Sequence, residues 1–159
     1  MRRKVKKLRS SLEDRVVEAI SEHGYEFEYE SFKLVYIKSP SVYTPDLILP
    51  NGIIIEVKGY FDVDDRSKHL LIKEQYPMLD LRFVFQLSSK KINKASTTTY
   101  ADWCDKHGFK YHDGTIPQSW LKERGSKAGR ELYKDIKSSG RKTARKYTSG
   151  CFTSVKEGS

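Results

Sequence analysis

The stretch that decides the fold is Tyr43-Thr44-Pro45-Asp46-Leu47-Ile48-Leu49-Pro50-Asn51-Gly52-Ile53-Ile54-Ile55-Glu56-Val57-Lys58. Two apolar runs, 47–49 and 53–57, flank a Pro-Asn-Gly sequence, and Asn and Gly tolerate the positive φ angles of a tight turn. The continuous β-branched run 53–55 is typical of a strand that is covered on both faces. The stretch therefore predicts a β-hairpin within a buried sheet.

Three charged side chains lie at the open end of this hairpin. Asp46 begins the first strand, and Glu56 and Lys58 end the second. Residues two apart on a strand point to the same face, and a turn at 51–52 places Asp46 opposite Glu56. Because buried strands seldom carry charge without a partner or a purpose, we expect two carboxylates and an ammonium group to converge there.

This group of charges has two interpretations. Paired carboxylates at the end of a sheet bind Mg²⁺ or Mn²⁺, which activates a bound water and stabilises charge on a phosphoryl oxygen. An adjacent lysine then holds the phosphate or orients the attacking water. The alternative is a surface hairpin with an ordinary cross-strand Glu–Lys ion pair, because the bare pattern Asp…Glu-x-Lys is short.

The charge of the chain is unevenly distributed. The 159 residues carry a formal net charge of +9, with +6 in residues 1–9, +7 in residues 122–159 and −4 in residues 10–121. We therefore predict a basic N-terminal arm (1–9), a globular domain (10–121) and a basic C-terminal tail (122–159), helical in part when bound to DNA. Basic arms around an acidic centre favour a nucleic-acid partner; the alternatives are an aid to solubility or loose contact with RNA.

The cysteines and the hydropathy of the chain indicate in which cellular compartment the protein acts. Cys104 and Cys151 lie far apart with no CxxC spacing, which argues against a disulfide scaffold or a zinc site. No apolar run approaches the length of a membrane span, and no signal peptide is visible at the basic N-terminus. We expect a cytoplasmic protein with no membrane partner.

Helical and strand patterns alternate along the chain. Helices are predicted at 11–23, 62–75, 99–107 and shortly after 116–117, and strands at 27–30, 32–37 and 81–87. This order predicts an α/β (α+β) fold with a mixed central β-sheet flanked by helices. Glu13, in the first turn of the first helix, has a ready structural explanation as a capping-box carboxylate. Glu28 alternates with aromatic residues and has an equally ordinary explanation as a solvated outward side chain.

Basic side chains outside the hairpin are candidate phosphate contacts. The predicted DNA-binding set comprises Arg9, Arg66, Lys68, Lys73, Lys90 and Lys91. On the helix 62–75 the three cations are expected to face the DNA backbone while residues 70–72 pack inward. His69 is a lone histidine, for which packing or phosphate contact is a better explanation than metal ligation.

Several blocks together resemble one family. Ser10-Ser11-Leu12-Glu13-Asp14, Phe27-Glu28-Tyr29-Glu30, Tyr43-Thr44-Pro45-Asp46, Leu49-Pro50-Asn51-Gly52-Ile53 and residues 64–72 occur in that order. Within them, Pro45-Asp46 followed by Glu56-Val57-Lys58 is similar to the PD-(D/E)xK nuclease signature. From about residue 10 to 120 the chain resembles the phage endonuclease I family, the Holliday-junction resolvases of T-odd phages.

The resemblance implies a function and a site. The fold would be PD-(D/E)xK nuclease-like, in a strand-exchanged, intertwined homodimer that resolves four-way junctions and other branched DNA in the cytoplasm of a phage-infected bacterium. The implied catalytic residues are Glu13, Glu28, Asp46, Glu56 and Lys58. Asp46, Glu56, Glu13 and the main-chain carbonyl of Val57 would hold two Mg²⁺ (or Mn²⁺) ions per site, with Glu13 supplied by one chain and the remaining groups by the other.

Two rival functions remain open at this point. One is another PD-(D/E)xK endonuclease of the nicking or restriction type, and the other is a non-catalytic DNA-binding protein. No stretch resembles a helix that reads bases in the major groove, so we expect recognition of DNA shape rather than of sequence.

Overall fold

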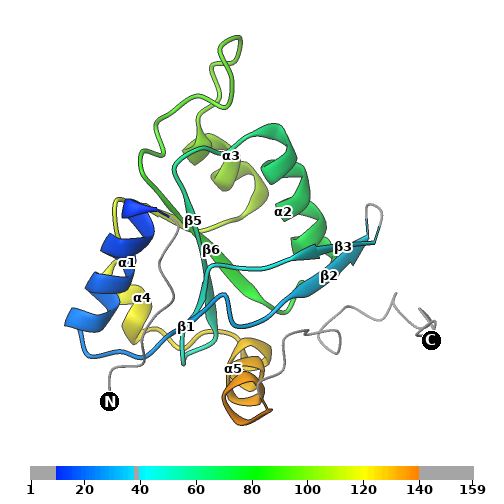
Figure 1. The fold of residues 1–159 in the computed structure, drawn as a ribbon. Coiled ribbons are helices and arrows are strands. Elements are labelled where there is room, and N and C mark those ends of the chain that lie inside the picture. Colours follow the sequence, from blue (N-terminus) through cyan, green and yellow to red (C-terminus); the bar gives the residue numbers. More distant parts are fainter. Residues whose placement is uncertain (1–9, 38–39, 140–159) are drawn as a thin grey trace.

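A five-stranded sheet with helices on both faces organises the computed structural model, which describes residues 10–37 and 40–139 (Figure 1). The strands lie in the order β1 (Glu28–Tyr29), β4 (Leu47–Ile48), β5 (Ile53–Lys58), β6 (Asp80–Phe85) and β7 (Tyr111–Asp113). The pairs β1–β4 and β4–β5 are antiparallel, and β5–β6 and β6–β7 are parallel. The predicted mixed sheet flanked by helices is therefore confirmed.

The helices begin close to where the sequence predicts them. They are α1 (Ser11–Glu22), α2 (Val63–Gln75), α3 (Tyr100–His107), α4 (Gln118–Lys122) and α5 (Lys127–Ser139). Side chains at the N-caps accept hydrogen bonds from main-chain amides of the first turn: Ser10 Oγ from Glu13 at 3.2 Å, and Asp62 Oδ1 from Asp65 at 2.8 Å.

The β4–β5 hairpin has the predicted turn. Gly52 has φ +87° and its amide donates to the carbonyl of Leu49 at 2.8 Å. In the paired register Leu47 lies opposite Ile55, which places Asp46 opposite Glu56, as expected.

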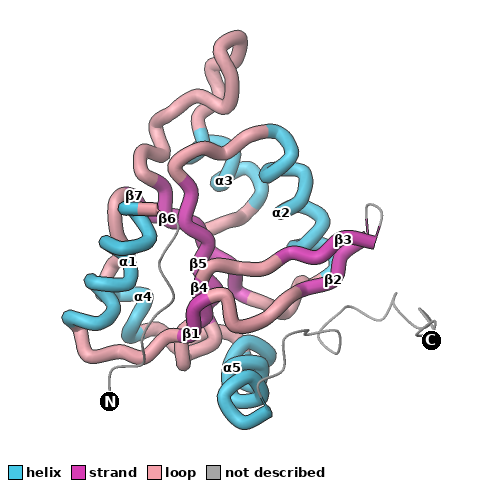
Figure 2. Tube along the Cα trace, in the orientation of Figure 1, coloured by secondary structure: helices cyan, strands magenta, loops and turns pink. Residues whose placement is uncertain are grey.

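Alternation along β5 divides the core between the two faces of the sheet. Ile53, Ile55 and Val57 pack with α1 and α4, whereas Ile54 packs with residues of α2 and α5. Figure 2 shows α1 and α4 on one side of the strands and α2 and α3 on the other. Since β5 is covered on both faces, its charged end must find partners within the fold.

The C-terminal segment contributes to this core. The sequence predicts a boundary at residue 121, but Leu132, Tyr133 and Ile136 of α5 are buried in the same cluster as Ile54. A Cβ atom at Gly129 would lie 2.1 Å from the Gly52 carbonyl oxygen, so α5 lies directly against the hairpin turn. The packed domain thus continues through α5.

A separate two-stranded sheet precedes the central hairpin. Its strands are β2 (Leu34–Ile37) and β3 (Pro40–Tyr43), which pair antiparallel within one chain. The exchange of strands between subunits remains a prediction from the resemblance. Arg9 lies outside the described residues, and no helix among those described is long and apolar enough to cross a membrane.

Candidate active site

The two carboxylates of the hairpin lie next to one another and are held by hydrogen bonds. Asp46 Oδ2 accepts from the main-chain amide of Val57 at 2.7 Å. Glu56, only 4% exposed, accepts from the Tyr43 hydroxyl at 2.6 Å through Oε2. Its other oxygen, Oε1, lies 3.2 Å from Lys58 Nζ. The strand register and the buried surroundings therefore fix both carboxylates at the end of β5.

Glu13 comes to the same place from α1. It is 7% exposed, and its carboxylate accepts from Ser10 Oγ at 3.1 Å and from the Tyr29 hydroxyl at 2.5 Å. The capping interaction with Ser10 is therefore real, but Glu13 also acts electrostatically on Asp46.

Crowding of negative charge changes the titration of Asp46. Burial, and then the charges of Glu56 and Glu13, raise the pKa of Asp46 to about 8, although the Val57 amide and Lys58 act in the opposite direction. The ionised form of Asp46 is therefore disfavoured at this position.

Lys58 is fixed by a second acidic residue that the sequence analysis did not select. Its Nζ lies 3.0 Å from Asp65 Oδ1 in the first turn of α2, and Asp65 Oδ1 also accepts from Lys68 Nζ at 2.9 Å. Burial lowers the pKa of Lys58, but the charges of Glu56 and Asp65 outweigh it and raise the pKa above its usual value. The lysine is thus a positioned cation beside Glu56.

A buried histidine lies beside Glu56 within the core. The His69 side chain is fully buried, with Nδ1 2.7 Å from the Asp65 carbonyl oxygen and Nε2 3.7 Å from Glu56 Oε1. Its ring meets that of Tyr43 edge to face at 5.2 Å, and burial lowers the pKa of His69 to about 4. Asp65 and His69 are four residues apart on α2, a spacing that could have pointed to this contact.

The donor set fits a hard divalent cation. Asp46, Glu56 and Glu13 supply carboxylate oxygens, which Mg²⁺ and Mn²⁺ prefer. Within residues 10–37 and 40–139 no three His, Cys, Asp or Glu side chains already stand in metal-ligand positions. The main-chain group of Val57 seen in contact with Asp46 is the amide, so ligation by its carbonyl stays a prediction.

The basic residues predicted to contact DNA have different environments. Arg66 is buried, and its guanidinium group donates to the carbonyl of Phe61 at 2.6 Å and to that of Ile92 at 3.4 Å. Lys73 donates to the carbonyls of His107 and Gly108 at 2.8 and 2.6 Å, at the end of α3. Arg66 is therefore used inside the fold, whereas Lys73 is exposed and bonded to the end of α3.

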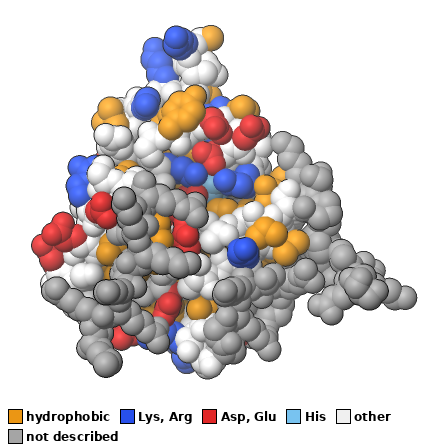
Figure 3. Space-filling model, in the orientation of Figure 1, with side chains coloured by type: hydrophobic (Ala, Val, Ile, Leu, Met, Phe, Trp, Pro, Cys, Tyr) orange, Lys and Arg blue, Asp and Glu red, His pale blue; other side chains and the backbone are white. Residues whose placement is uncertain are grey.

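The remaining candidates lie at the surface or near it. Lys68 borders the site through Asp65, and Lys90 and Lys91 are exposed on the loop after β6. Glu28 is half-buried on β1, opposite Ile48. Figure 3 shows acidic and basic side chains side by side in the centre of this face, around the end of β5 and the start of α2.

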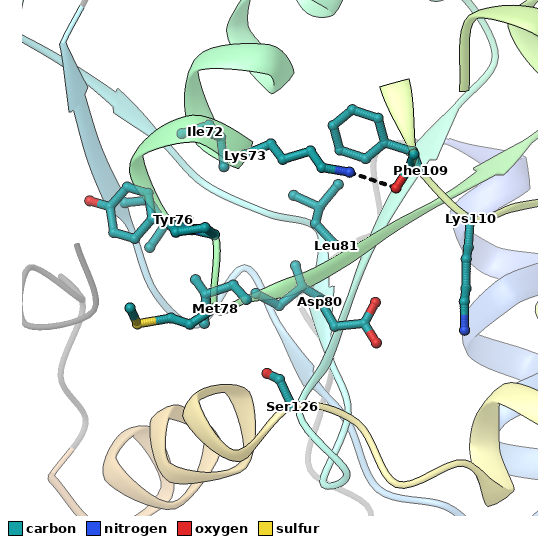
Figure 4. A pocket seen from close by; sticks show the side chains of 14 residues that line it. Ile72, Lys73, Tyr76, Met78, Asp80, Leu81, Phe109, Lys110 and Ser126 are labelled. Atoms are coloured by element: carbon teal, nitrogen blue, oxygen red, sulfur yellow. Dashed lines mark hydrogen bonds between the residues drawn. The ribbon is translucent and has the colours of Figure 1, made fainter. Parts of the chain in front are cut away.

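Two hollows lie near these elements. One, of about 460 Å³, is lined by Tyr36, Asp62, Asp64, Asp65 and Lys68 and so adjoins the site. The other, of about 280 Å³, lies toward the C-terminal end of α2. Figure 4 shows Ile72, Tyr76 and Leu81 in its wall and Lys73, whose ammonium group donates to the Gly108 carbonyl, close to Phe109. None of the three carboxylates lines this second pocket.

An acidic hairpin with a fixed lysine at the edge of a mixed sheet defines a candidate phosphodiesterase site, and comparison with known proteins agrees with that class. The sequence model of the family described as phage endonuclease I matches residues 1–140. The chain belongs to this family, which confirms the resemblance found in the sequence.

Two characterised relatives have endonuclease names. The chain is similar to Endonuclease I of Escherichia phage T7, with 50% identity over 123 residues that cover 76% of this chain and 83% of the relative. It is also similar to Endodeoxyribonuclease 1 of Enterobacteria phage T3, with 50% identity over 117 residues that cover 72% of this chain and 77% of the relative.

Proposed function

We propose that this protein is a structure-selective DNA endonuclease that resolves four-way (Holliday) junctions and other branched DNA by divalent-metal-dependent hydrolysis. The observation that carries the proposal is the placement of Asp46 opposite Glu56, with Lys58 Nζ 3.2 Å from Glu56, in a chain of the phage endonuclease I family. A PD-(D/E)xK type of fold is part of the proposal.

Each residue of the site has a proposed task. Asp46 and Glu56, with the Val57 carbonyl, would hold a Mg²⁺ or Mn²⁺ ion, and Asp46 and Glu13 would hold a second. When bound, the ions supply positive charge to the entering and leaving oxygens. Lys58, fixed by Glu56 and Asp65, binds the scissile phosphate or orients the water. Glu28 belongs to the proposed catalytic residues, but no particular step of the hydrolysis is assigned to it.

A homodimer would account for paired incisions. Two copies present two such sites, so that strands of like polarity in a four-way junction are cut symmetrically. The basic residues 1–9 and 122–159 supply affinity that does not depend on sequence and that falls with salt. The relatives are phage proteins, and we expect this chain to act in the cytoplasm of an infected host.

One cleavage assay tests the proposal against its rivals. A synthetic four-way junction and a linear duplex of the same arm sequence are incubated with Mg²⁺ or with EDTA. We expect paired cuts in the junction with Mg²⁺ alone. Equal or faster cutting of the duplex would instead identify a nicking or restriction-type endonuclease.

Matched variants separate catalysis from binding. Glu56→Gln should abolish cutting while junction binding persists, whereas Glu22→Gln, the same change at an exposed position of α1, should retain both. Binding without any cutting by the native protein at all metal concentrations would support the non-catalytic alternative.

A further inference from the structure

Two exposed apolar side chains follow the strands that end at the proposed site. Tyr60 is 65% exposed and Leu87 is 55% exposed. They follow the ends of two adjacent parallel strands: Lys58 of β5 pairs with Phe85 of β6, and the Gln86 amide donates to the Lys58 carbonyl at 3.1 Å. Tyr60 and Leu87 thus lie the same number of residues beyond the two strand ends, and we call them the edge pair.

The edge pair is held by rigid neighbours. Phe61 is fully buried, and its amide donates to the Tyr100 hydroxyl at 3.2 Å. On the other strand, the Ser88 amide donates to Asp113 Oδ1 at 3.0 Å. Tyr60 therefore stands between the fixed cation Lys58 and an anchored core residue, so its main chain is already positioned before a partner binds.

The charges around the edge pair favour one kind of partner. Lys90 Nζ lies 5.6 Å from the centroid of the Tyr60 ring, which places positive charge beside an aromatic face. Asp62 and Asp64 follow directly in the chain and disfavour a phosphate group at this point. An uncharged, flat, aromatic group meets both conditions, and a nucleobase is such a group.

We infer that Tyr60, with Leu87 beside it, stacks on an exposed nucleobase at the branch point of the DNA, close to the phosphate that Lys58 contacts. This inference rests on the proposed function. In a continuous duplex both faces of each base are covered by neighbouring bases, whereas a branch point or an unpaired end leaves a face open. The edge pair therefore favours branched DNA over duplex without reading its sequence.

A binding experiment tests the inference without cleavage. The full chain is titrated in EDTA with a four-way junction that carries 2-aminopurine at the branch point, and separately with a duplex. Tyr60→Ala should weaken junction binding by about 10- to 100-fold and leave duplex binding within about twofold. It should also abolish the quenching of 2-aminopurine fluorescence that stacking causes. Tyr60→Phe should restore both, and Met78→Ala, an exposed apolar control away from the site, should change neither.

Three results would overturn the inference. Stacking would be excluded if Tyr60→Ala bound the junction as tightly as the native chain and quenched 2-aminopurine fluorescence to the same extent. Equal losses on junction and duplex would identify a general DNA contact. A change in sedimentation with Tyr60→Ala would show that the edge pair is an interface between copies of the chain. If the native chain itself shows no preference for the junction, the proposed function fails; if it does and Tyr60→Ala shows the same preference, only the inference fails.

Discussion

Replacing Asp46 by asparagine should stabilise the metal-free protein while it abolishes cutting. Burial, Glu56 and Glu13 raise the pKa of the Asp46 carboxyl from 3.8 to about 8 in the folded chain. Because the folded pKa exceeds the unfolded one, the folded state binds the proton more tightly. The contribution of Asp46 to the free energy of unfolding is therefore largest below about pH 4 and falls as the pH rises toward 8.

The size of the effect follows from the same difference in pKa. A pKa unit corresponds to about 1.36 kcal/mol, so a difference of about 4 sets an upper limit of ~5 kcal/mol at pH 8. Coupling among the carboxylates reduces this limit, and we expect a gain of roughly 2–4 kcal/mol for Asp46→Asn at that pH. The asparagine carbonyl can still accept from the Val57 amide, so the local hydrogen bond is kept. For a chain of this length the gain corresponds to roughly 5–15 °C in Tm.

Thermal unfolding followed by circular dichroism, in EDTA at pH 4 and pH 8, measures the gain. Asp46→Asn should unfold at higher temperature than the native chain at pH 8 and at nearly the same temperature at pH 4. Asp105→Asn, at an exposed position of α3, serves as the matched control and should show no such pH dependence. Mg²⁺ should reduce the difference in Tm between Asp46→Asn and the native chain at pH 8, because it stabilises the native chain and not the variant. A lower Tm for Asp46→Asn, or an equal gain at both pH values, would refute the reasoning.

Three other substitutions address the surroundings of the site. Tyr43→Phe removes the hydroxyl that donates to Glu56. Titration calorimetry should show Mn²⁺ binding weakened about 10- to 100-fold, with an unchanged circular dichroism spectrum. Unaltered Mn²⁺ affinity would mean that the tyrosine contributes to core packing and not to the metal site. Arg66→Ala leaves buried carbonyls without their donor and should lower the free energy of unfolding by roughly 2–4 kcal/mol. The dependence of DNA affinity on salt concentration should not change. A weaker salt dependence at unchanged stability would show that Arg66 contacts a phosphate. Gly129→Ala places a methyl group against the Gly52 carbonyl and should lower the free energy of unfolding by about 1–3 kcal/mol in urea, an outcome that an unchanged midpoint would contradict.

Local chemistry explains what the sequence predicted well. The Asn51-Gly52 turn fixes the register of the hairpin, and the register fixes Asp46 opposite Glu56. Capping by Ser10 and Asp62 likewise determines where α1 and α2 begin. These features depend on residues within a few positions of one another, so they can be inferred without knowledge of the tertiary fold.

Tertiary contacts explain what the sequence did not reveal. Charge alone does not indicate whether Arg66 donates to a phosphate or to a carbonyl of its own chain, and the structure shows the second. The contact between Tyr43 and Glu56 joins β3 to β5, and the contact between Asp65 and Lys58 joins a helix to a strand. The sequence predicts a helical part of residues 122–159, at about 129–137, but only in the bound state on DNA. Leu132 and Ile136 are one turn apart and mark the face that α5 buries in the core.

The contact between Gly129 and Gly52 has a consequence for biosynthesis. Translation produces the hairpin that carries Asp46 and Glu56 long before it produces α5, and α5 is the last described helix of the chain. The nascent chain on the ribosome therefore lacks the element that covers the outside of the hairpin turn. A chain that is released early, before α5, would carry Asp46 and Glu56 on a hairpin whose turn is left open to solvent.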